Sequence, residues 1–240
     1  VARNQARGQE NPALFEVGPQ YADDTPEGQA LVAAGLRAGM TGPRSWAAPP
    51  RAVDAFDAKA DALAALAGAG APVANAQVEA DAPGWYHPGR SGTIRLGKTV
   101  LAHFGELHPR VLAAMDAEGP VAGFEIYLDD LPPVKAGPAR KLLALSAFQP
   151  VRRDFAFIVD EAVAAADLMR AARGADRQLI TDVALFDLYQ GKGVAEGRKS
   201  LAIAVTLQPT EATLTDAEID AVADKIVAAV VKKTGGELRG

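Results

Sequence analysis

The order of strand and helix patterns after residue 150 constrains the fold of this chain more than any other feature. A strand pattern, a helix pattern, two further strands, a long helix and a short closing segment follow one another. In order, the segments are "DFAFIVD", "AVAAADLMRAARG", "LITDVALFDLY", "LAIAVTL", "TLTDAEIDAVADKIVAAVVKK" and "GGELRG". This β-α-β-β-α-β order predicts an antiparallel sheet with both helices on one face, the ferredoxin-like arrangement. The opposite face of the sheet would then be free.

The long helix also shows where it begins and which side it buries. Thr215 and Glu218 fit the capping box, in which the two residues satisfy each other's backbone N–H groups at the first turn. Apolar residues then recur at helical spacing, which predicts a buried stripe along one side. The residues of this stripe are Ile219, Val222, Ile226 and Val230.

The first half of the chain mixes short strands with helices. "ALFEVG" and "GFEIYL" are typical of strands, and "VDAFDAKADALAALAGAG" predicts a helix in which Phe56, Leu63 and Leu66 follow a roughly helical spacing with alanines between them. "ELHPRVLAAMDAEG" predicts a short helix that ends at Gly119. Proline, glycine and charge gather in "DDLPPVKAGPARK", which indicates a linker. We therefore expect an α+β protein with two domains, residues 1–145 and 146–240.

Composition excludes several classes of protein. The chain of 240 residues has no cysteine, so disulfides and thiolate metal sites are excluded, and a reducing cytoplasm is the expected location. A run long enough to cross a membrane is missing from the sequence. The net charge of −5 argues against binding nucleic acid through the mean field of the protein. Because the chain starts at Val1 without a leader, we expect it to be part of a longer protein.

The free face of the second sheet carries the candidate binding residues. Leu201, Ile203, Val205 and Leu207 should face the helices, which leaves Ser200, Ala202, Ala204 and Thr206 on the other side. If the preceding strand runs unbroken, Asp187 and Tyr189 share one of its faces. A tyrosine can stack under a base, Asp and Ser can bond base edges, and Arg or Lys can hold phosphates. The same side chains also fit an ordinary solvent-facing hairpin, since residues 151–240 carry 12 basic and 14 acidic residues.

Several segments resemble one known family. "FQPVRRDFAFIVDE", "LFDLYQGKGVAEGRKSLAIAVTLQP", "TLTDAEIDAVADKIVAAV" and "GGELR" resemble the C-terminal ferredoxin-fold anticodon-binding domain of the bacterial phenylalanyl-tRNA synthetase β subunit. "ALFEVG", "WYHPGRSGTIRLGK" and "FGELHPRVLAAMD" resemble the class II synthetase-like module that precedes it in that subunit. The resemblance implies an antiparallel-sheet module, partial and non-catalytic, followed by a ferredoxin-like βαββαβ domain.

The resemblance also implies partners and contacts. The family forms an α2β2 enzyme that joins phenylalanine to tRNA(Phe) with ATP and magnesium, and its active site lies in the α subunit, so we expect no cofactor or metal in this part. Tyr189 would stack on an anticodon base, and Asp187, Ser200 and Arg239 would bond nearby. On chemical grounds, the candidates for contact with the RNA backbone are Arg152, Arg153, Arg198 and Lys199. Arg152 and Arg153 could equally brace the start of their strand.

Two features of the first half argue against catalysis within this chain. Class II active sites hold ATP with an Arg two positions before a Glu, and here Leu14 precedes Glu16. The later segment "GFEIYLDDL" contains no Arg. We therefore expect no catalytic residue. Alternatives left open are a structural module that docks on protein rather than RNA, and a small metabolic enzyme with a ligand near His87 or His103.

The histidines and tryptophans favour structural roles. His103 and His108 are five residues apart and interrupted by Gly105, which does not match the i, i+4 spacing of a helical zinc site. His87 begins "HPGR", a turn signal. Trp46 and Trp85 are expected to be packed rather than to bind a ligand.

Overall fold

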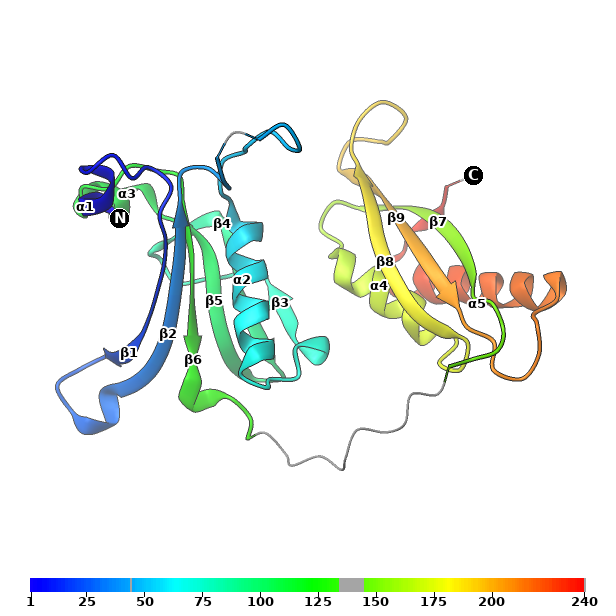
Figure 1. The fold of residues 1–240 in the computed structure, drawn as a ribbon. Coiled ribbons are helices and arrows are strands. Elements are labelled where there is room, and N and C mark those ends of the chain that lie inside the picture. The colour runs from blue at the N-terminus through cyan, green and yellow to red at the C-terminus, as the bar shows by residue number, and fades with distance from the viewer. Residues whose placement is uncertain (44, 134–144, 240) are drawn as a thin grey trace. The chain divides into compact units, whose positions relative to one another are not determined.

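The computed structural model describes residues 1–43, 45–133 and 145–239. The chain divides into two compact units, Val1–Gly137 and Pro138–Gly240, which are called the N-terminal and C-terminal units below (Figure 1). The predicted linker starts within a 3-10 turn, Leu128–Asp130, and most of it lies outside the described residues. None of the described helices is long and apolar enough to cross a membrane.

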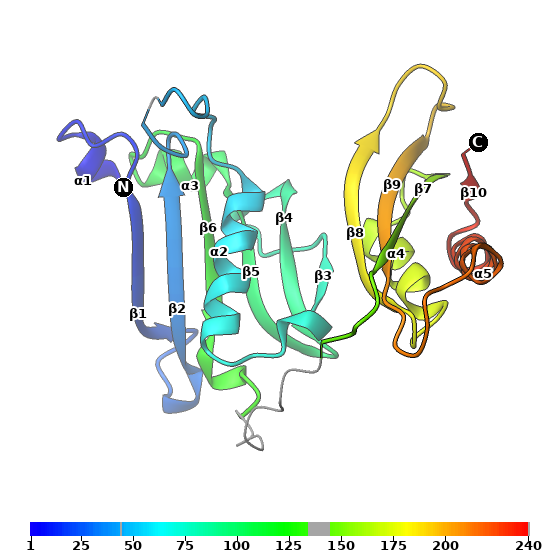
Figure 2. The same cartoon turned by 45° about the vertical axis from the view of Figure 1, so that its right-hand side comes forward.

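The N-terminal unit is built on an antiparallel sheet of six strands. Its strands are β1 (Ala13–Tyr21), β2 (Gln29–Ala38), β3 (Gln77–Glu79), β4 (Tyr86–Leu96), β5 (Thr99–Leu107) and β6 (Val121–Tyr127). They lie in the order β1-β2-β6-β5-β4-β3. Its helices are α1 (Ala2–Gln5), α2 (Ala55–Gly68) and α3 (Pro109–Ala114), and Pro26–Gly28 and Val73–Asn75 form 3-10 turns. Figure 2 shows α2 lying along one face of the sheet.

Helix α2 closes the core of the N-terminal unit. Asp54 caps the helix and forms a capping box with Asp57, which fixes where the helix starts. Its buried residues are Ala58, Ala62 and Leu66, so small side chains let the helix approach the sheet closely. Phe56 shares the roughly helical spacing of Leu63 and Leu66 but falls outside the buried stripe and is 75% exposed.

Other local expectations for the N-terminal unit had mixed outcomes. Helix α3 ends at Ala114 rather than Gly119, since Asp116 takes a positive φ of 51° and turns the chain away. His87 accepts a hydrogen bond at Nδ1 from the Gly89 N–H, but both residues lie within β4, where the register shifts between Tyr86 and Ser91, so a strand irregularity replaces the expected turn. Trp46 and Trp85 are 99% and 40% exposed, so the expectation that both are packed was wrong. Trp46 lies in an irregular segment with no element over it.

The C-terminal unit has the predicted β-α-β-β-α-β order. Its elements are β7 (Val151–Asp160), α4 (Ala165–Gly174), β8 (Ile180–Tyr189), β9 (Arg198–Leu207), α5 (Asp216–Thr234) and β10 (Glu237–Leu238). The strands form an antiparallel sheet in the order β10-β7-β9-β8. Figure 2 shows α4 and α5 on the same side of this sheet. The split βαβ arrangement is therefore confirmed.

The core of the C-terminal unit lies between its sheet and its two helices. Phe157 and Val159 of β7 are fully buried, as are Leu201 and Ile203 of β9, which confirms the predicted inner face of β9. Helix α5 begins at the predicted capping box of Thr215 and Glu218, and it ends at Gly235 in the left-handed conformation. The four residues of its predicted stripe are all buried.

Candidate nucleic-acid interface

Two irregularities in β8 decide which of its side chains reach the helix-free face of the C-terminal sheet. The register shifts between Ile180 and Asp182, and again between Leu185 and Asp187. Before the second shift Leu185 pairs with Ile203, a buried residue of the helix side, and after it Asp187 pairs with Ala202. Each extra residue reverses the alternation of the strand. The bulge at Phe186 therefore puts Asp187 and Tyr189 on the helix-free face, although the strand does not run unbroken.

The helix-free face is organised in rows of residues that face one another across the strands. One row holds Glu237, Ile158, Ser200 and Tyr189, in the strand order β10-β7-β9-β8. The neighbouring row holds Ala156, Ala202 and Asp187, and Arg239 extends it because its N–H donates to the Ala156 carbonyl at 2.8 Å. Paired residues point to the same face, so these side chains share one surface.

Tyr189 is held at its hydroxyl end and partly exposed along its ring. Its hydroxyl donates to the Lys192 carbonyl at 3.1 Å. Gly191 lies so close that a Cβ there would be 3.0 Å from the Tyr189 oxygen, so a side chain at this position would press on the hydroxyl. The side chain is still 38% exposed. The ring is thus positioned by the turn after β8 and remains accessible.

Arg239 lies over the Tyr189 ring, with its guanidinium carbon 5.8 Å from the ring centroid. The two residues come from opposite edges of the sheet, and Ala156 and Ala202 lie between them in the row that Arg239 extends. The methyl side chains of these alanines leave space for an arginine to cross. This arrangement is a cation–π contact, of a kind worth about 0.5–1 kcal/mol at exposed sites.

The register separates the four basic backbone candidates into two groups. Arg152 pairs with Thr206 and Arg198 pairs with Asp160, and both lie on the helix-free face. Arg153 pairs with Val205, and Lys199 pairs with Val159, both of which are buried on the helix side. Arg153 and Lys199 therefore point away from Tyr189, since neighbouring residues of a strand face opposite sides.

Several of the candidate residues already have partners within the chain. Arg198 binds Glu237 at 2.6 Å and also donates to the Ile158 carbonyl at 3.0 Å. Lys199 donates to the Glu161 carbonyl at 2.8 Å. Arg152 lies 3.4 Å from Asp154 in an exposed ion pair. Exposed pairs of this kind are weak and can be exchanged for an RNA phosphate, whereas Arg198 has two partners to give up.

Ser200 is more deeply buried than the sequence predicted. It lies on the helix-free face, as predicted, but is 4% exposed, and Ala204 is equally covered. Its neighbours in the row are Ile158 and Tyr189, whose larger side chains rise on either side of it. The hydroxyl can meet a ligand after one of these neighbours moves.

The N-terminal sheet has a hollow whose lining residues can be compared with those that a site for ATP needs. A cavity of about 300 Å³ is lined by residues of β1, β2, β6 and the ends of β4 and β5. Its lining includes Leu14 and the carboxylates of Glu16 and Glu125, and none of the lining residues is Lys, Arg or His. Two carboxylates without a cation would repel the phosphates of ATP. These residues therefore do not fit that cofactor.

Glu125 in this hollow is half-buried, and its carboxylate accepts a hydrogen bond from Trp85 Nε1 at 3.2 Å. Burial raises the pKa of the Glu125 carboxyl, although the Trp85 hydrogen bond opposes this change. A carboxyl whose pKa is raised by folding costs stability once the pH exceeds its value in the unfolded chain.

We expect Glu125→Gln to stabilise the N-terminal unit at neutral pH, because an amide keeps an acceptor for Trp85 without a buried charge. The gain should be absent at pH values below 4.5, the ordinary pKa of the group, and should grow as the pH rises through the raised pKa. Fluorescence-monitored unfolding can measure it, since both tryptophans of the chain lie in this unit. An equal gain at every pH would contradict this explanation.

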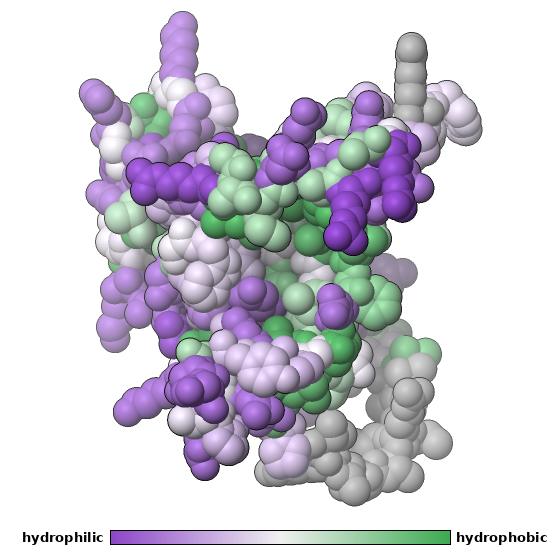
Figure 3. All heavy atoms as spheres, turned by 90° about the vertical axis from the view of Figure 1, so that its left-hand side faces the viewer, coloured by the Kyte–Doolittle hydropathy of each residue, from purple (hydrophilic) through white to green (hydrophobic). Residues whose placement is uncertain are grey.

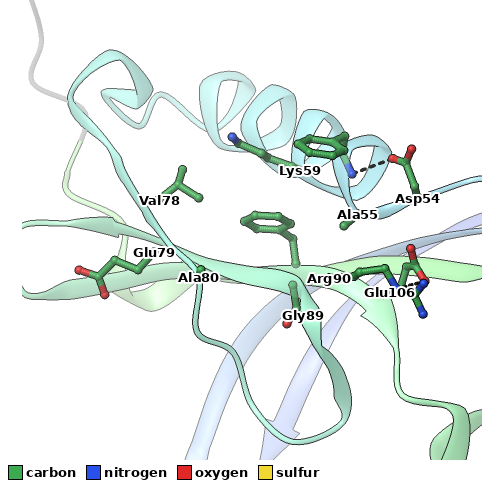
Figure 4. A pocket seen from close by; sticks show the side chains of 12 residues that line it. Asp54, Ala55, Lys59, Val78, Glu79, Ala80, Gly89, Arg90 and Glu106 are labelled. Carbon is green, nitrogen blue, oxygen red and sulfur yellow. Dashed lines mark hydrogen bonds and ion pairs between the residues drawn. The ribbon is translucent and has the colours of Figure 1, made fainter. Parts of the chain in front are cut away.

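A second cavity, of about 350 Å³, lies between the start of α2 and β4. Figure 4 shows Arg90 directed at Glu106 within it, and the two form an ion pair at 2.9 Å. Asp54, on the opposite side of the cavity, caps α2 by accepting from the Phe56 N–H. Three of the charged groups that line the cavity are thus engaged within the fold itself.

The histidines of the N-terminal unit also have structural partners. His103 Nδ1 lies 2.8 Å from the Thr93 hydroxyl, which itself donates to the Asp81 carbonyl, and burial lowers the pKa of His103. His108 caps α3 by accepting from the Arg110 N–H. Within the described residues, no group of three or more His, Cys, Asp or Glu side chains could hold a metal ion.

The edge of the N-terminal sheet exposes a row of apolar side chains. Phe15, Val17 and Tyr21 of β1 are 84%, 54% and 63% exposed. The view onto this side of the unit shows hydrophobic groups gathered in its middle and framed by hydrophilic ones (Figure 3). Exposed apolar surface of this kind is typical of a contact with another protein.

Comparison with known families matches both units. The model of the "Ferredoxin-fold anticodon binding domain" matches residues 146–239, and that of the "Phenylalanyl tRNA synthetase beta chain CLM domain" matches residues 1–128. These two matches together cover most of the chain. Each falls within one of the two units described above.

Curated relatives carry the same description. The chain is 59% identical over its whole length to the phenylalanine–tRNA ligase beta subunit of Rhodospirillum rubrum, and 60% identical to that of Paramagnetospirillum magneticum. It spans 30% of the length of each relative. A pyrrolysyl tRNA synthetase from Desulfitobacterium hafniense aligns over 53% of this chain and 43% of its own, at 14% identity, with a TM-score of 0.38, a likeness too weak to place the fold.

Proposed function

Because the chain belongs to the phenylalanyl-tRNA synthetase beta-chain family, we propose that its C-terminal unit binds the anticodon stem-loop of tRNA(Phe). The observation that carries this proposal is the accessible Tyr189 ring on a helix-free sheet face, with Asp187 and Arg239 beside it. An unpaired base can stack on the tyrosine, while the carboxylate bonds a base edge and the arginine meets a phosphate.

The other candidate residues differ in whether they can reach the RNA in this proposal. Arg152 lies on the same face and can turn from Asp154 to a phosphate. Ser200 can bond the RNA once Tyr189 or Ile158 shifts. Arg153 and Lys199 point to the helix side, and we do not assign them a contact. The protein still has a net charge of −5, so affinity must come from this local constellation.

The N-terminal unit serves, in this proposal, as a non-catalytic module of class II synthetase type. Leu14 and the carboxylate-lined hollow support this assignment, because neither can hold the phosphates of ATP. The exposed apolar edge of β1 would pack on the α subunit of an α2β2 enzyme in the cytoplasm, and the α subunit would supply the site that uses ATP and magnesium. The domain boundary would lie near residue 145.

The proposal predicts that the isolated chain, given phenylalanine, ATP and tRNA(Phe), forms no aminoacyl-tRNA. The α subunit should be required for activity, because the ATP site lies there. Charging assays on the chain alone and on the assembled enzyme can measure this. Aminoacylation by the chain alone would contradict the non-catalytic assignment.

The alternative is a structural module whose C-terminal sheet docks on protein. The row of exposed apolar residues on β1 favours protein contact for the N-terminal unit, and Leu185, Phe186 and Leu188 of β8 are the exposed apolar residues that would favour it for the C-terminal sheet. Crosslinking of tRNA(Phe) to the assembled enzyme separates the two functions. Crosslinks from the Tyr189 region to the anticodon loop would support RNA binding, whereas their absence with intact assembly would favour protein docking.

A further inference from the structure

The short strand β10 is attached to the sheet by one side chain from a distant part of the chain. Arg198 lies on β9 and Glu237 on β10, with β7 between the two strands. The guanidinium crosses β7, donating to the Ile158 carbonyl at 3.0 Å and to the Glu237 carboxylate at 2.6 Å. Arg198 is one-third exposed and Glu237 is 61% exposed, so the bond to the Ile158 carbonyl is partly shielded from water and the ion pair is open to it.

The strand itself offers few other attachments. Strand β10 has two residues, which pair with Ile158 and Phe157, and the following Arg239 N–H bonds the Ala156 carbonyl. The approach to the sheet is tight, because a Cβ on Gly236 would come within 2.7 Å of Val159. A two-residue edge strand is marginal alone, so the Arg198 contact adds to the few backbone bonds that hold it.

Holding β10 also places Arg239 over Tyr189. Arg239 follows Glu237 by two positions, with Leu238 between them, so both side chains lie on the same face of the strand. If the Glu237 side is released, the backbone bond at Arg239 is the next to fray, and the guanidinium loses its position over the ring.

We propose that Arg198 and Glu237 form a clamp that positions Arg239 at the base-stacking site, and that Arg198 is a positioning residue rather than a phosphate contact. This inference rests on the proposed RNA-binding function. It assigns a role to Glu237, an acidic side chain beside an RNA site, where mean-field electrostatics alone would make it unfavourable.

Glu237→Gln tests the clamp because the clamp and a purely electrostatic effect of the carboxylate predict opposite changes in the affinity for RNA. Removing a negative charge near RNA should strengthen binding if Glu237 acts through its field. The clamp predicts weaker binding instead, by about 2- to 5-fold, because the stacked arginine is no longer held. The measurement is the dissociation constant of the assembled enzyme for the anticodon stem-loop of tRNA(Phe). Asp220→Asn, an exposed charge on α5, is the matched control and should change binding little.

Two further variants make the result specific. Glu237→Gln combined with Arg239→Gln should bind no more weakly than Arg239→Gln alone, since both act through one guanidinium. Arg198→Gln combined with Arg239→Gln should likewise bind no more weakly than Arg239→Gln alone, whereas a direct phosphate contact of Arg198 would make the two losses add. Stronger or unchanged binding by Glu237→Gln, or additive effects in either double variant, would overturn the clamp. Unchanged binding by Tyr189→Ala would instead overturn the proposed function itself.

Discussion

Replacing Tyr189 with alanine should weaken binding of the anticodon stem-loop by about 5- to 150-fold, because one stacked base contributes about 1–3 kcal/mol. The ring is accessible and already positioned by the Lys192 carbonyl and by Gly191. Little ordering cost is therefore paid on binding, which keeps the expected effect large. The measurement is the dissociation constant of the assembled enzyme, with assembly checked separately.

Tyr189→Phe is the matched control for this experiment. It keeps the ring and loses the hydroxyl bond to Lys192, so binding should fall much less than in the alanine variant. If both variants lose affinity equally, the hydroxyl rather than the ring is responsible, and stacking is excluded. If neither does, RNA does not use this face.

Replacing Phe157 with alanine should destabilise the C-terminal unit by about 3–5 kcal/mol, the usual cost of removing a fully buried phenylalanine. Phe157 is 0% exposed and packs in the cluster between the sheet and both helices. Its ring also stacks against Phe155 at a centroid distance of 6.2 Å. A loss of this size is a large fraction of a domain's stability. Urea unfolding of the chain followed by far-UV circular dichroism can measure it.

The chain provides an internal reference for that measurement. Trp46 and Trp85, its two tryptophans, both belong to the N-terminal unit, so tryptophan fluorescence follows that unit and circular dichroism follows both. The fluorescence transition should stay in place in Phe157→Ala. Phe186→Ala, at a position 54% exposed, removes the same side chain from the surface and should cost about 0.5 kcal/mol or less. Equal losses at both positions would contradict the packing argument.

The sequence predicted the elements of the C-terminal unit because the apolar residues of each segment recur at a clear spacing. Alternation in β9 and the capping box of α5 are local signals, and the structure keeps both. Adjacent basic residues were grouped by chemistry alone, yet strand alternation already implies that Arg198 and Lys199 face opposite sides. The alternation of β9 is therefore sufficient, by itself, to assign these two residues to different faces of the sheet.

Other features had no local signal. The bulge at Phe186 depends on how β8 meets β9, and nothing in the residues around it marks the extra position. Glu237 was missed as a partner because it lies 39 residues from Arg198 in the chain. The exposed Phe56 shows a third limit, since alanines can form the buried stripe of a helix while a nearby aromatic residue stays outside it.

The bulge in β8 gives this strand one residue more than β9 needs between the pairing of Leu185 with Ile203 and that of Asp187 with Ala202. Straightening the strand with every residue kept would turn Asp187 and Tyr189 to the helix side. Deleting Phe186 would instead leave Leu185 facing the helices and Asp187 and Tyr189 facing away from them. We therefore expect a chain that lacks Phe186 to keep both side chains on the helix-free face.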